Sequence, residues 1–329
     1  MRPRSAFAAA LATLLLAGLA CAPTSLAAGR VVIYNADTVE FGEAFAKAFN
    51  SQHPDIKVEI ISAGVGQLFT RVKAEAARPQ GDIMLAASKE SFIQMADLFQ
   101  PYVSKRDADF PERMKDKERR SYGFSMPLQV LIINTTLIPA AEAPRAWKDL
   151  GDAKWKGKII MANPALSGSA YAQLAQMLQL HGWPLVQQVV KNATITSSSK
   201  LAYQGVGTGE FAIGLTGEEN VFKLKSEGRP VEAVHPAEGT GLRYDAVGII
   251  KGGPNPENAK LFLDFLNSKE AHTIAAGNPF FRRSARKDVA PPPGLKPTGE
   301  IKFFDYDVEK AARDKAANLK KFEEVMAAK

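Results

Sequence analysis

Short apolar runs alternate along the chain with segments whose apolar residues recur at helical spacing. Residues 31–34, 56–60 and 82–86 are apolar or alternating runs of the length and composition of strands. The segments between them carry Phe41, Phe45 and Phe49, then Leu68 and Val72, at the spacing of one helical face. Because strands and helices alternate, the pattern predicts an α/β protein with a mostly parallel sheet.

The same pattern recurs in the second half, after a change near residue 127. The expected strands are 159–161, 211–215 and 231–234, and the expected helices begin near 169 and 200 or cover 183–191, 258–268 and 308–327. We interpret 128–134 and 246–250 as extended segments that cross between two lobes. The predicted division is a signal peptide at 1–28, a first lobe of 29–126 with 243–280, and a second lobe of 127–242 with 281–329, which includes the terminal helix.

The amino terminus has the three parts of a secretory signal peptide. Arg2 and Arg4 precede an apolar stretch at 6–20, and the small residues at 25–28 suit cleavage. A lipid anchor at Cys21 is the disfavoured alternative, because Gly18 occupies the place where such signals prefer leucine. Cleavage removes the single cysteine, so we expect an exported periplasmic protein with no disulfide.

Length and charge set broad limits on the fold and its partners. Removing 28 of 329 residues leaves 301, which is more than one core usually supports, so two domains are expected. The net charge of +7 falls to +5 once Arg2 and Arg4 are removed. The densest basic patches, 105–120 and Arg282-Arg283 with Arg286-Lys287, lack interleaved aromatic residues, so we interpret them as solvated surface and expect no nucleic-acid partner.

The segment 158–180 combines a strand, a small-residue turn and the start of a helix. Ser167 or Ser169 occupies the expected cap position, and Gly168 leaves the backbone uncovered. The first turn of a helix has unpaired N–H groups and partial positive charge, so this segment can bind an anion without lysine or arginine. The alternative is an ordinary capped helix.

Three turns in the first half also follow strands and lie where ligands bind in parallel sheets. These turns are 35–38, 64–67 and 86–88. They provide the candidate ligand residues Asn35, Thr38, Gly66, Gln67 and Ser88. Thr38 and Gln67 have helix-start roles as their alternative, and Asp37 is expected to be a helix cap rather than a ligand.

The chain resembles periplasmic solute-binding proteins of ABC importers, in the group that binds ferric iron, phosphonates and hexose phosphates. The resemblance implies a two-lobed periplasmic-binding-protein-like (type II) fold, two crossing hinge strands, closure on a ligand and delivery to an inner-membrane ABC permease. We expect a monomer. The segments that carry the resemblance span nearly all of the mature chain in one order: 32–35, 54–59, 63–64, 67–68, Arg71 with Glu75, 164–168, 208–210, Pro236, 238–240 and 259–265.

The resemblance also implies which site features are kept and which are lost. Iron binders of this group carry a histidine where this chain has Thr38, and a tyrosine pair near Asn220-Val221 that this chain lacks. The group's anion anchor matches Ser167, Gly168, Ser169 and Ser198. We therefore expect a small anionic solute, phosphorylated or phosphonylated, with no metal and no cofactor.

Three glutamates are candidates for contacting the rest of the solute, beyond its anionic group. Glu218, Glu219 and Glu238 are positioned to receive its hydroxyl groups or an amine. A solvated turn is the alternative for the first two, and a hinge hydrogen bond is the alternative for Glu238.

Other functions stay open from the sequence. A ferric-iron binder with different ligands is the first alternative. A serine hydrolase is the second, because Ser197–Lys200 matches S-x-x-K, although the companion S-D-N and K-T-G motifs are absent. An exported structural protein without a small ligand is the third.

Overall fold

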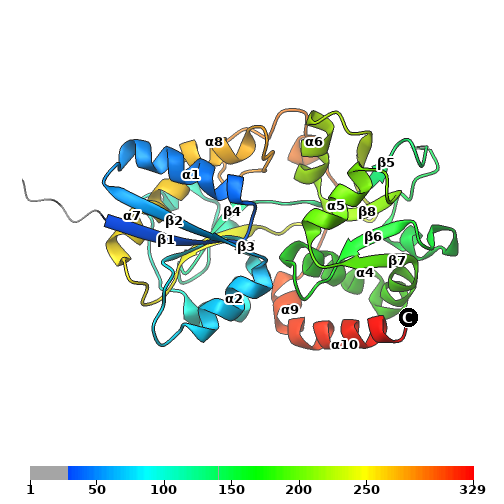
Figure 1. The fold of residues 1–329 in the computed structure, drawn as a ribbon, viewed down its shortest axis with the longest axis horizontal. Helices are drawn as coiled ribbons and strands as arrows, with labels where there is room; N and C mark the ends of the chain where they lie inside the picture. Colours follow the sequence, from blue (N-terminus) through cyan, green and yellow to red (C-terminus); the bar gives the residue numbers. More distant parts are fainter. Residues whose placement is uncertain (1–28, 140) are drawn as a thin grey trace, which may run out of the picture.

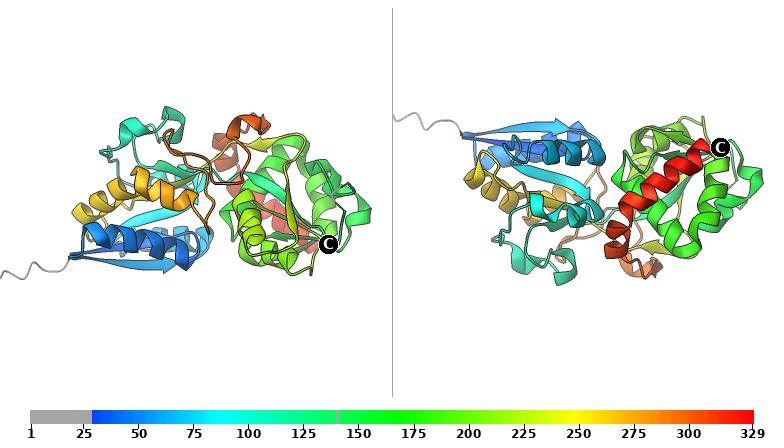
Figure 2. Two further views of the ribbon diagram at one scale, coloured as in Figure 1. Left: turned by 90° about the horizontal axis from the view of Figure 1, so that it is seen from above. Right: turned by 90° about the horizontal axis from the view of Figure 1, so that it is seen from below.

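The chain forms two lobes that lie side by side in the computed structural model (Figures 1 and 2). The structure describes residues 29–139 and 141–329. The signal peptide predicted for 1–28, including Cys21, lies outside this part of the chain. Within the described ranges, no helix combines the length and apolar character needed to cross a membrane.

The first lobe contains a five-stranded sheet in the order β2-β1-β3-β11-β4. β1 runs parallel to β2 and β3, whereas β11 runs antiparallel to both of its neighbours. α1 and α2 lie on opposite faces of this sheet (Figure 1). The elements are β1 (Gly29–Asn35), α1 (Val39–Gln52), β2 (Ile56–Ser62), α2 (Val65–Ala74), β3 (Ile83–Ser88), α3 (Lys89–Gln94), β4 (Tyr122–Ser125), β11 (Asp245–Ile249), α7 (Pro256–Leu266) and α8 (Lys269–Ala276).

Aromatic residues join the two chain segments that build the first lobe. Phe41, Phe45 and Phe49 on α1 are fully buried, as their helical spacing predicts. The ring of Phe49 lies 4.8 Å from the ring of Phe262 on α7, measured between centroids. The amino-terminal helix is therefore packed against residues more than 200 positions later in the chain.

The second lobe contains a five-stranded sheet in the order β7-β6-β8-β5-β9. Alternate residues of β5 face opposite layers: Leu131 and Ile133 pack with α4, and Val130 and Ile132 pack with α5 and α6. The elements are β5 (Gln129–Asn134), β6 (Ile159–Ala162), α4 (Gly168–Asn192), β7 (Ala193–Thr196), α5 (Ser199–Gly207), β8 (Ile213–Gly217), α6 (Glu218–Ser226), β9 (Val231–Val234), β10 (Thr240–Gly241), β12 (Phe303–Phe304), α9 (Val308–Arg313) and α10 (Lys315–Ala327).

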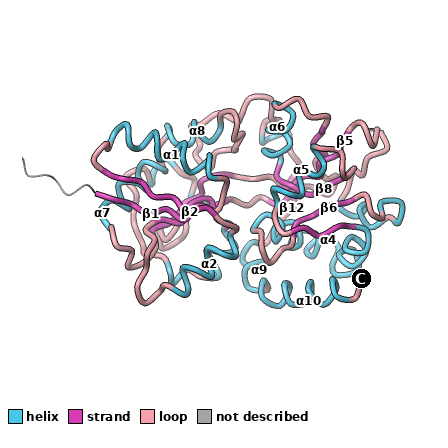
Figure 3. The backbone as a smooth tube through the Cα atoms, in the orientation of Figure 1, coloured by secondary structure: helices cyan, strands magenta, loops and turns pink. Residues whose placement is uncertain are grey.

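The chain passes between the two sheets at more than one place. It leaves the first sheet after Ser125, enters the second at Gln129, and returns between Gly241 and Asp245. After α8 it leads back to α9 and α10, which lie along the second lobe (Figure 2). β5 and β11 each enter a sheet from the other lobe and run antiparallel to both neighbours, whereas the other four strands of each sheet run in one direction. The predicted fold of mostly parallel sheets with two crossing strands is therefore confirmed. In both lobes the strands lie between helices (Figure 3).

Several elements differ from the sequence prediction. Residues 193–196, for which no strand was expected, form the edge strand β7, and residues 218–220, expected as a turn, begin α6. The expected helices near 169 and over 183–191 are continuous, apart from a kink at Gly182, where φ is 69°. The terminal helix is divided at Asp314 into α9 and α10.

Candidate functional site

A cleft of about 580 Å³ lies between the lobes, lined by residues from both. Five strands, β1, β2, β6, β7 and β8, end at its edge, as expected for ligand sites in α/β sheets. The lining residues are Ala36–Glu40, Ser62–Val65, Gln67, Ala86, Pro127, Leu166–Ser169, Ser197–Lys200, Tyr203, Glu219, Asn220, Asp245 and Arg282.

First-turn residues of five helices line this cleft. They belong to α1 and α2 of the first lobe and to α4, α5 and α6 of the second. The cap residues Gly64 of α2 and Gly217 of α6 make no side-chain hydrogen bond to their helices, so these helices receive no side-chain cap. Unpaired N–H groups and helix dipoles from both lobes thus favour negative charge in the cleft.

Three serine hydroxyls meet where α4 and α5 begin. The Oγ atom of Ser199 lies 2.5 Å from Ser167 Oγ and 2.9 Å from Ser169 Oγ, and the latter two are 3.2 Å apart. Each hydroxyl can rotate to donate its proton to an acceptor in the cleft. Ser167 also caps α4 by accepting from the N–H of Ala170. We call Ser167, Ser169 and Ser199 the serine triad.

Glycines allow the lobes to touch beside the serine triad. A Cβ atom on Gly64 would lie 2.7 Å from the carbonyl oxygen of Leu166, and one on Gly66 would lie 2.6 Å from that of Ala165. A Cβ on Gly168 would lie 3.1 Å from Ser88. These approaches connect α2 of the first lobe with the turn before α4 of the second, and a side chain at Gly64 or Gly66 would obstruct them.

The cleft also contains acidic residues around one arginine. Arg282 Nη2 lies 2.5 Å from Asp37 Oδ2, and Arg282 Nη1 lies 2.9 Å from Glu219 Oε1. Burial raises the pKa of the Glu219 carboxyl to about 7, although Arg282 opposes this shift. Burial also raises the pKa of Tyr203 to about 12, so this phenol stays protonated and is a neutral hydrogen-bond donor.

Seven of the residues predicted from the sequence line the cleft. Because they come from five separate turns of the chain, only the fold brings them together. Whether each contacts a solute stays a prediction. They are Thr38, Gln67, Ser167, Gly168, Ser169, Ser198 and Glu219.

Three predicted ligand residues of the first lobe lie behind the cleft surface. Asn35 is fully buried and its amide donates to Thr38 O and Ser62 Oγ, so it shapes the turn before α1. Ser88 is also buried, and its hydroxyl bonds to Ser91. Gly66 lies against the second lobe instead of the cleft lumen. These three residues are not among those lining the cleft.

Two predicted glutamates are occupied elsewhere. Glu218 is 1% exposed and forms an ion pair with Arg283 and a hydrogen bond with His235. Glu238 accepts hydrogen bonds from the N–H groups of Trp147 and Lys148 and pairs with the ring of His181. Because neither lines the cleft, the ligand role predicted for them is not supported by their positions.

Sequence reasoning missed the role of the basic residues at 282–286. Arg282 is largely buried in the cleft, and Arg283 and Arg286 are buried in ion pairs, so interpreting them as solvated surface was wrong. Asp37, Glu218 and Glu219 balance this positive charge, but only the fold shows that they pair with the arginines. The cap of α1 is Thr38 rather than Asp37, because Thr38 Oγ1 accepts from the N–H of Phe41.

Removing Arg283 should destabilise the protein strongly. The side chains of Arg283 and Glu218 are 2% and 1% exposed, so Arg283→Met leaves a buried carboxylate without its main partner. Loss of one member of a buried ion pair costs about 3–5 kcal/mol. Denaturant unfolding should show this decrease in the free energy of unfolding, whereas Lys287→Met on the exposed neighbour should change it by less than about 0.5 kcal/mol. A loss below about 1 kcal/mol in Arg283→Met would contradict the expectation.

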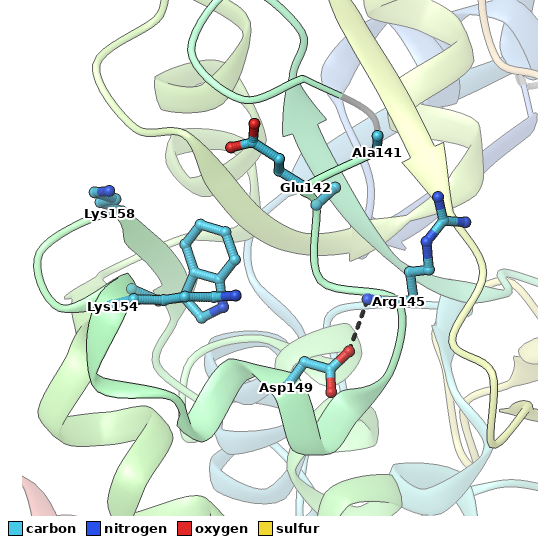
Figure 4. A pocket seen from close by; sticks show the side chains of 8 residues that line it. Ala141, Glu142, Arg145, Asp149, Lys154 and Lys158 are labelled. Atoms are coloured by element: carbon cyan, nitrogen blue, oxygen red, sulfur yellow. Dashed lines mark hydrogen bonds between the residues drawn. The ribbon is translucent and has the colours of Figure 1, made fainter.

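A second hollow of about 480 Å³ lies on the second lobe alone (Figure 4). Glu142, Lys154 and Lys158 surround it, together with Arg145 and Asp149. The Asp149 carboxylate accepts from the N–H groups of Arg145 and Ala146, so it is committed to holding the local turn. No helix start of the first lobe contributes to this hollow, and lobe movement cannot enclose a ligand there.

The chain matches the sequence model of the family described as bacterial extracellular solute-binding protein over residues 31–280. It is 32% identical to an uncharacterised protein of Haemophilus influenzae, over 96% of each chain. It is 27% identical to a putative 2-aminoethylphosphonate-binding periplasmic protein of Salmonella typhi, over 85% of this chain and 86% of that one. Iron uptake protein A1 of Synechocystis is 26% identical, over 74% and 71%.

A solved structure agrees with this fold across both lobes. It is the periplasmic binding protein AfuA of Actinobacillus pleuropneumoniae with exogenous fructose-6-phosphate bound. The match has a TM-score of 0.85 and 28% identity, and it covers 91% of this chain and 99% of that one.

Proposed function

Since the chain belongs to the family of bacterial extracellular solute-binding proteins, whose members bind substrates and are not enzymes, we propose that it is the binding component of an ABC importer. It captures a small organic solute that carries a phosphate or phosphonate group, in the cleft between its lobes. After removal of the signal peptide it works as a monomer in the periplasm. Movement about the connecting segments closes the lobes, and the closed form delivers the solute to an inner-membrane permease.

The main support for this proposal is that five helices begin at the cleft that contains the serine triad. Five helices from two lobes begin at the cleft, and three hydroxyls lie within 3.2 Å of one another there. A tetrahedral anion has enough acceptor oxygens for several such donors at once. The Salmonella relative and the AfuA structure, whose ligands carry phosphonate and phosphate groups, support the same chemistry.

The other polar residues of the cleft suit a polar tail on the solute. Asp37, Glu219 and Asp245 offer carboxylate acceptors, and Tyr203 and Arg282 offer donors. Sugar hydroxyls both donate and accept hydrogen bonds, and an ammonium group donates three, so both tails fit this composition. Of the three glutamates predicted to contact this tail, Glu219 lines the cleft.

Iron is another cargo named among the relatives, and one of them is named as a ferric iron-binding protein. Iron held by protein side chains needs several hard oxygen or nitrogen donors that converge on one point. Within residues 29–139 and 141–329, no three His, Cys, Asp or Glu side chains are grouped so that they could hold a metal ion. We therefore favour the organic anion, and metal analysis of the purified protein tests the iron alternative.

Calorimetric titration of the purified mature protein tests the proposal. Fructose-6-phosphate and 2-aminoethylphosphonate are the probes, inorganic phosphate reports on the anion alone, and fructose is the matched uncharged control. We expect heat from at least one organic phosphate or phosphonate and none from fructose. Binding of fructose without binding of any phosphorus-containing probe would contradict the proposal.

A further inference from the structure

Arg282 connects the two lobes inside the cleft. It follows α8, and its backbone N–H donates to Ala275 O, so its main chain is fixed to the first lobe. Its guanidinium contacts Asp37 of the same lobe and Glu219 at the start of α6 in the second. The lobes therefore share one arginine through two carboxylates.

The surroundings of Arg282 hold its guanidinium in place. Its side chain is 12% exposed, and those of Asp37 and Glu219 are 13% and 7% exposed. The guanidinium carbon lies 5.5 Å from the centroid of the Phe41 ring. Burial lowers the pKa of Arg282, but the negative charges of Asp37, Glu219 and Asp245, which also line the cleft, outweigh this effect and raise the pKa above its ordinary value.

Asp37 and Glu219 bring carboxylates of the two lobes together in the cleft, whereas Asp245 has its own partner in Arg243. Bringing such groups together in a poorly solvated space is costly unless positive charge offsets them. In other proteins, a bound metal ion or a cationic group of a ligand offsets the charge of such carboxylates. Arginine does so permanently because its guanidinium does not lose its proton at physiological pH, and its planar fork can bond two carboxylates at once.

We infer that Arg282 is an internal cation on which the carboxylates of both lobes close. Lobe closure then depends on Asp37, Arg282 and Glu219 as one unit. This inference does not depend on which solute binds at the serine triad.

Single-molecule energy transfer between the lobes tests this role. Dyes at Lys47→Cys on α1 and Lys191→Cys on α4 report the distance between lobes, and the only native cysteine lies in the predicted signal peptide. Without added solute, we expect Arg282→Ala to lower the ratio of closed to open molecules at least about tenfold, the lower range for close charge pairs across an interface. Addition of guanidinium at about 10 mM, which hardly affects folding, should restore closure. Sodium chloride at equal ionic strength should not.

Two further variants make the result specific. Arg286→Ala removes another buried arginine, which pairs with Asp109 and Asp288 away from the cleft, and it should keep wild-type closure. Glu219→Gln is nearly isosteric and should open the lobes without rescue by guanidinium. If Arg282→Ala does not fold, the lobe closure measured in Glu219→Gln tests the inference by itself. Wild-type closure in either cleft variant, or equal effects of guanidinium and sodium chloride on Arg282→Ala, would overturn the inference.

Discussion

Ser167→Asp should abolish binding of a phosphorylated or phosphonylated solute while leaving the fold intact. Aspartate caps helices about as well as serine, so α4 should still begin at the same residue. The new carboxylate would lie within the serine triad, about 4 Å from a bound anion. At an effective dielectric constant of about 20, this repulsion is about 4 kcal/mol, which corresponds to roughly a thousandfold loss of affinity.

Calorimetry with the solute identified by titration measures this loss, and Ser167→Asn is the matched control. Asparagine has nearly the shape of aspartate and also caps helices, but it carries no charge. It should lose far less affinity than the aspartate variant. Equal losses in the two variants would assign the effect to shape, and unchanged affinity in Ser167→Asp would place the anion elsewhere.

Gly66→Ala should keep the lobes from closing fully and weaken solute binding by about 5- to 150-fold. The added Cβ would lie 2.6 Å from the carbonyl oxygen of Ala165 in the second lobe, and a backbone atom cannot yield as a flexible side chain can. Overpacking of this kind costs about 1–3 kcal/mol. Alanine favours helix over glycine, so α2 itself should become slightly more stable.

The combination of weaker binding with an unchanged or raised melting temperature distinguishes obstruction from unfolding. Calorimetry and thermal denaturation provide the two measurements. Gly299→Ala is the control, because no atom lies within 4 Å of the added Cβ and it should change neither quantity. Wild-type affinity in Gly66→Ala would show that the bound form does not need the contact between α2 and the turn before α4.

The sequence predicted those parts of the fold that depend on local pattern. Apolar spacing indicated most helices and strands, and the position of Ser167 indicated both a helix start and a possible anion anchor. The strand β7 was missed because its alternation of Ala193, Thr194, Ile195 and Thr196 is only four residues long and runs directly into a stretch of serines. The start of α6 was missed because two adjacent glutamates look like a solvated turn until their arginine partners are known.

The candidate site could be predicted only where a residue acts through its own turn. Ser167 caps the helix that follows it, so neighbouring residues are enough to place it, whereas the cap of α1 lies at Thr38, one residue after the expected Asp37. Arg282 and Asp37 are 245 positions apart, and no local pattern connects them. Ser199 joined the triad in place of Ser198, because a run of serines marks a helix start without showing which hydroxyl caps it.

The position of β11 has a consequence for how the protein matures. This strand lies between β3 and β4 and pairs with both, although it follows β4 by more than a hundred residues. The first sheet therefore stays incomplete until most of the polypeptide has been made, and its closure is a long-range event that slows folding. Because residues 129–241 of the second lobe lie between β4 and β11 in the chain, the first sheet cannot be completed before that stretch of the second lobe has been synthesised.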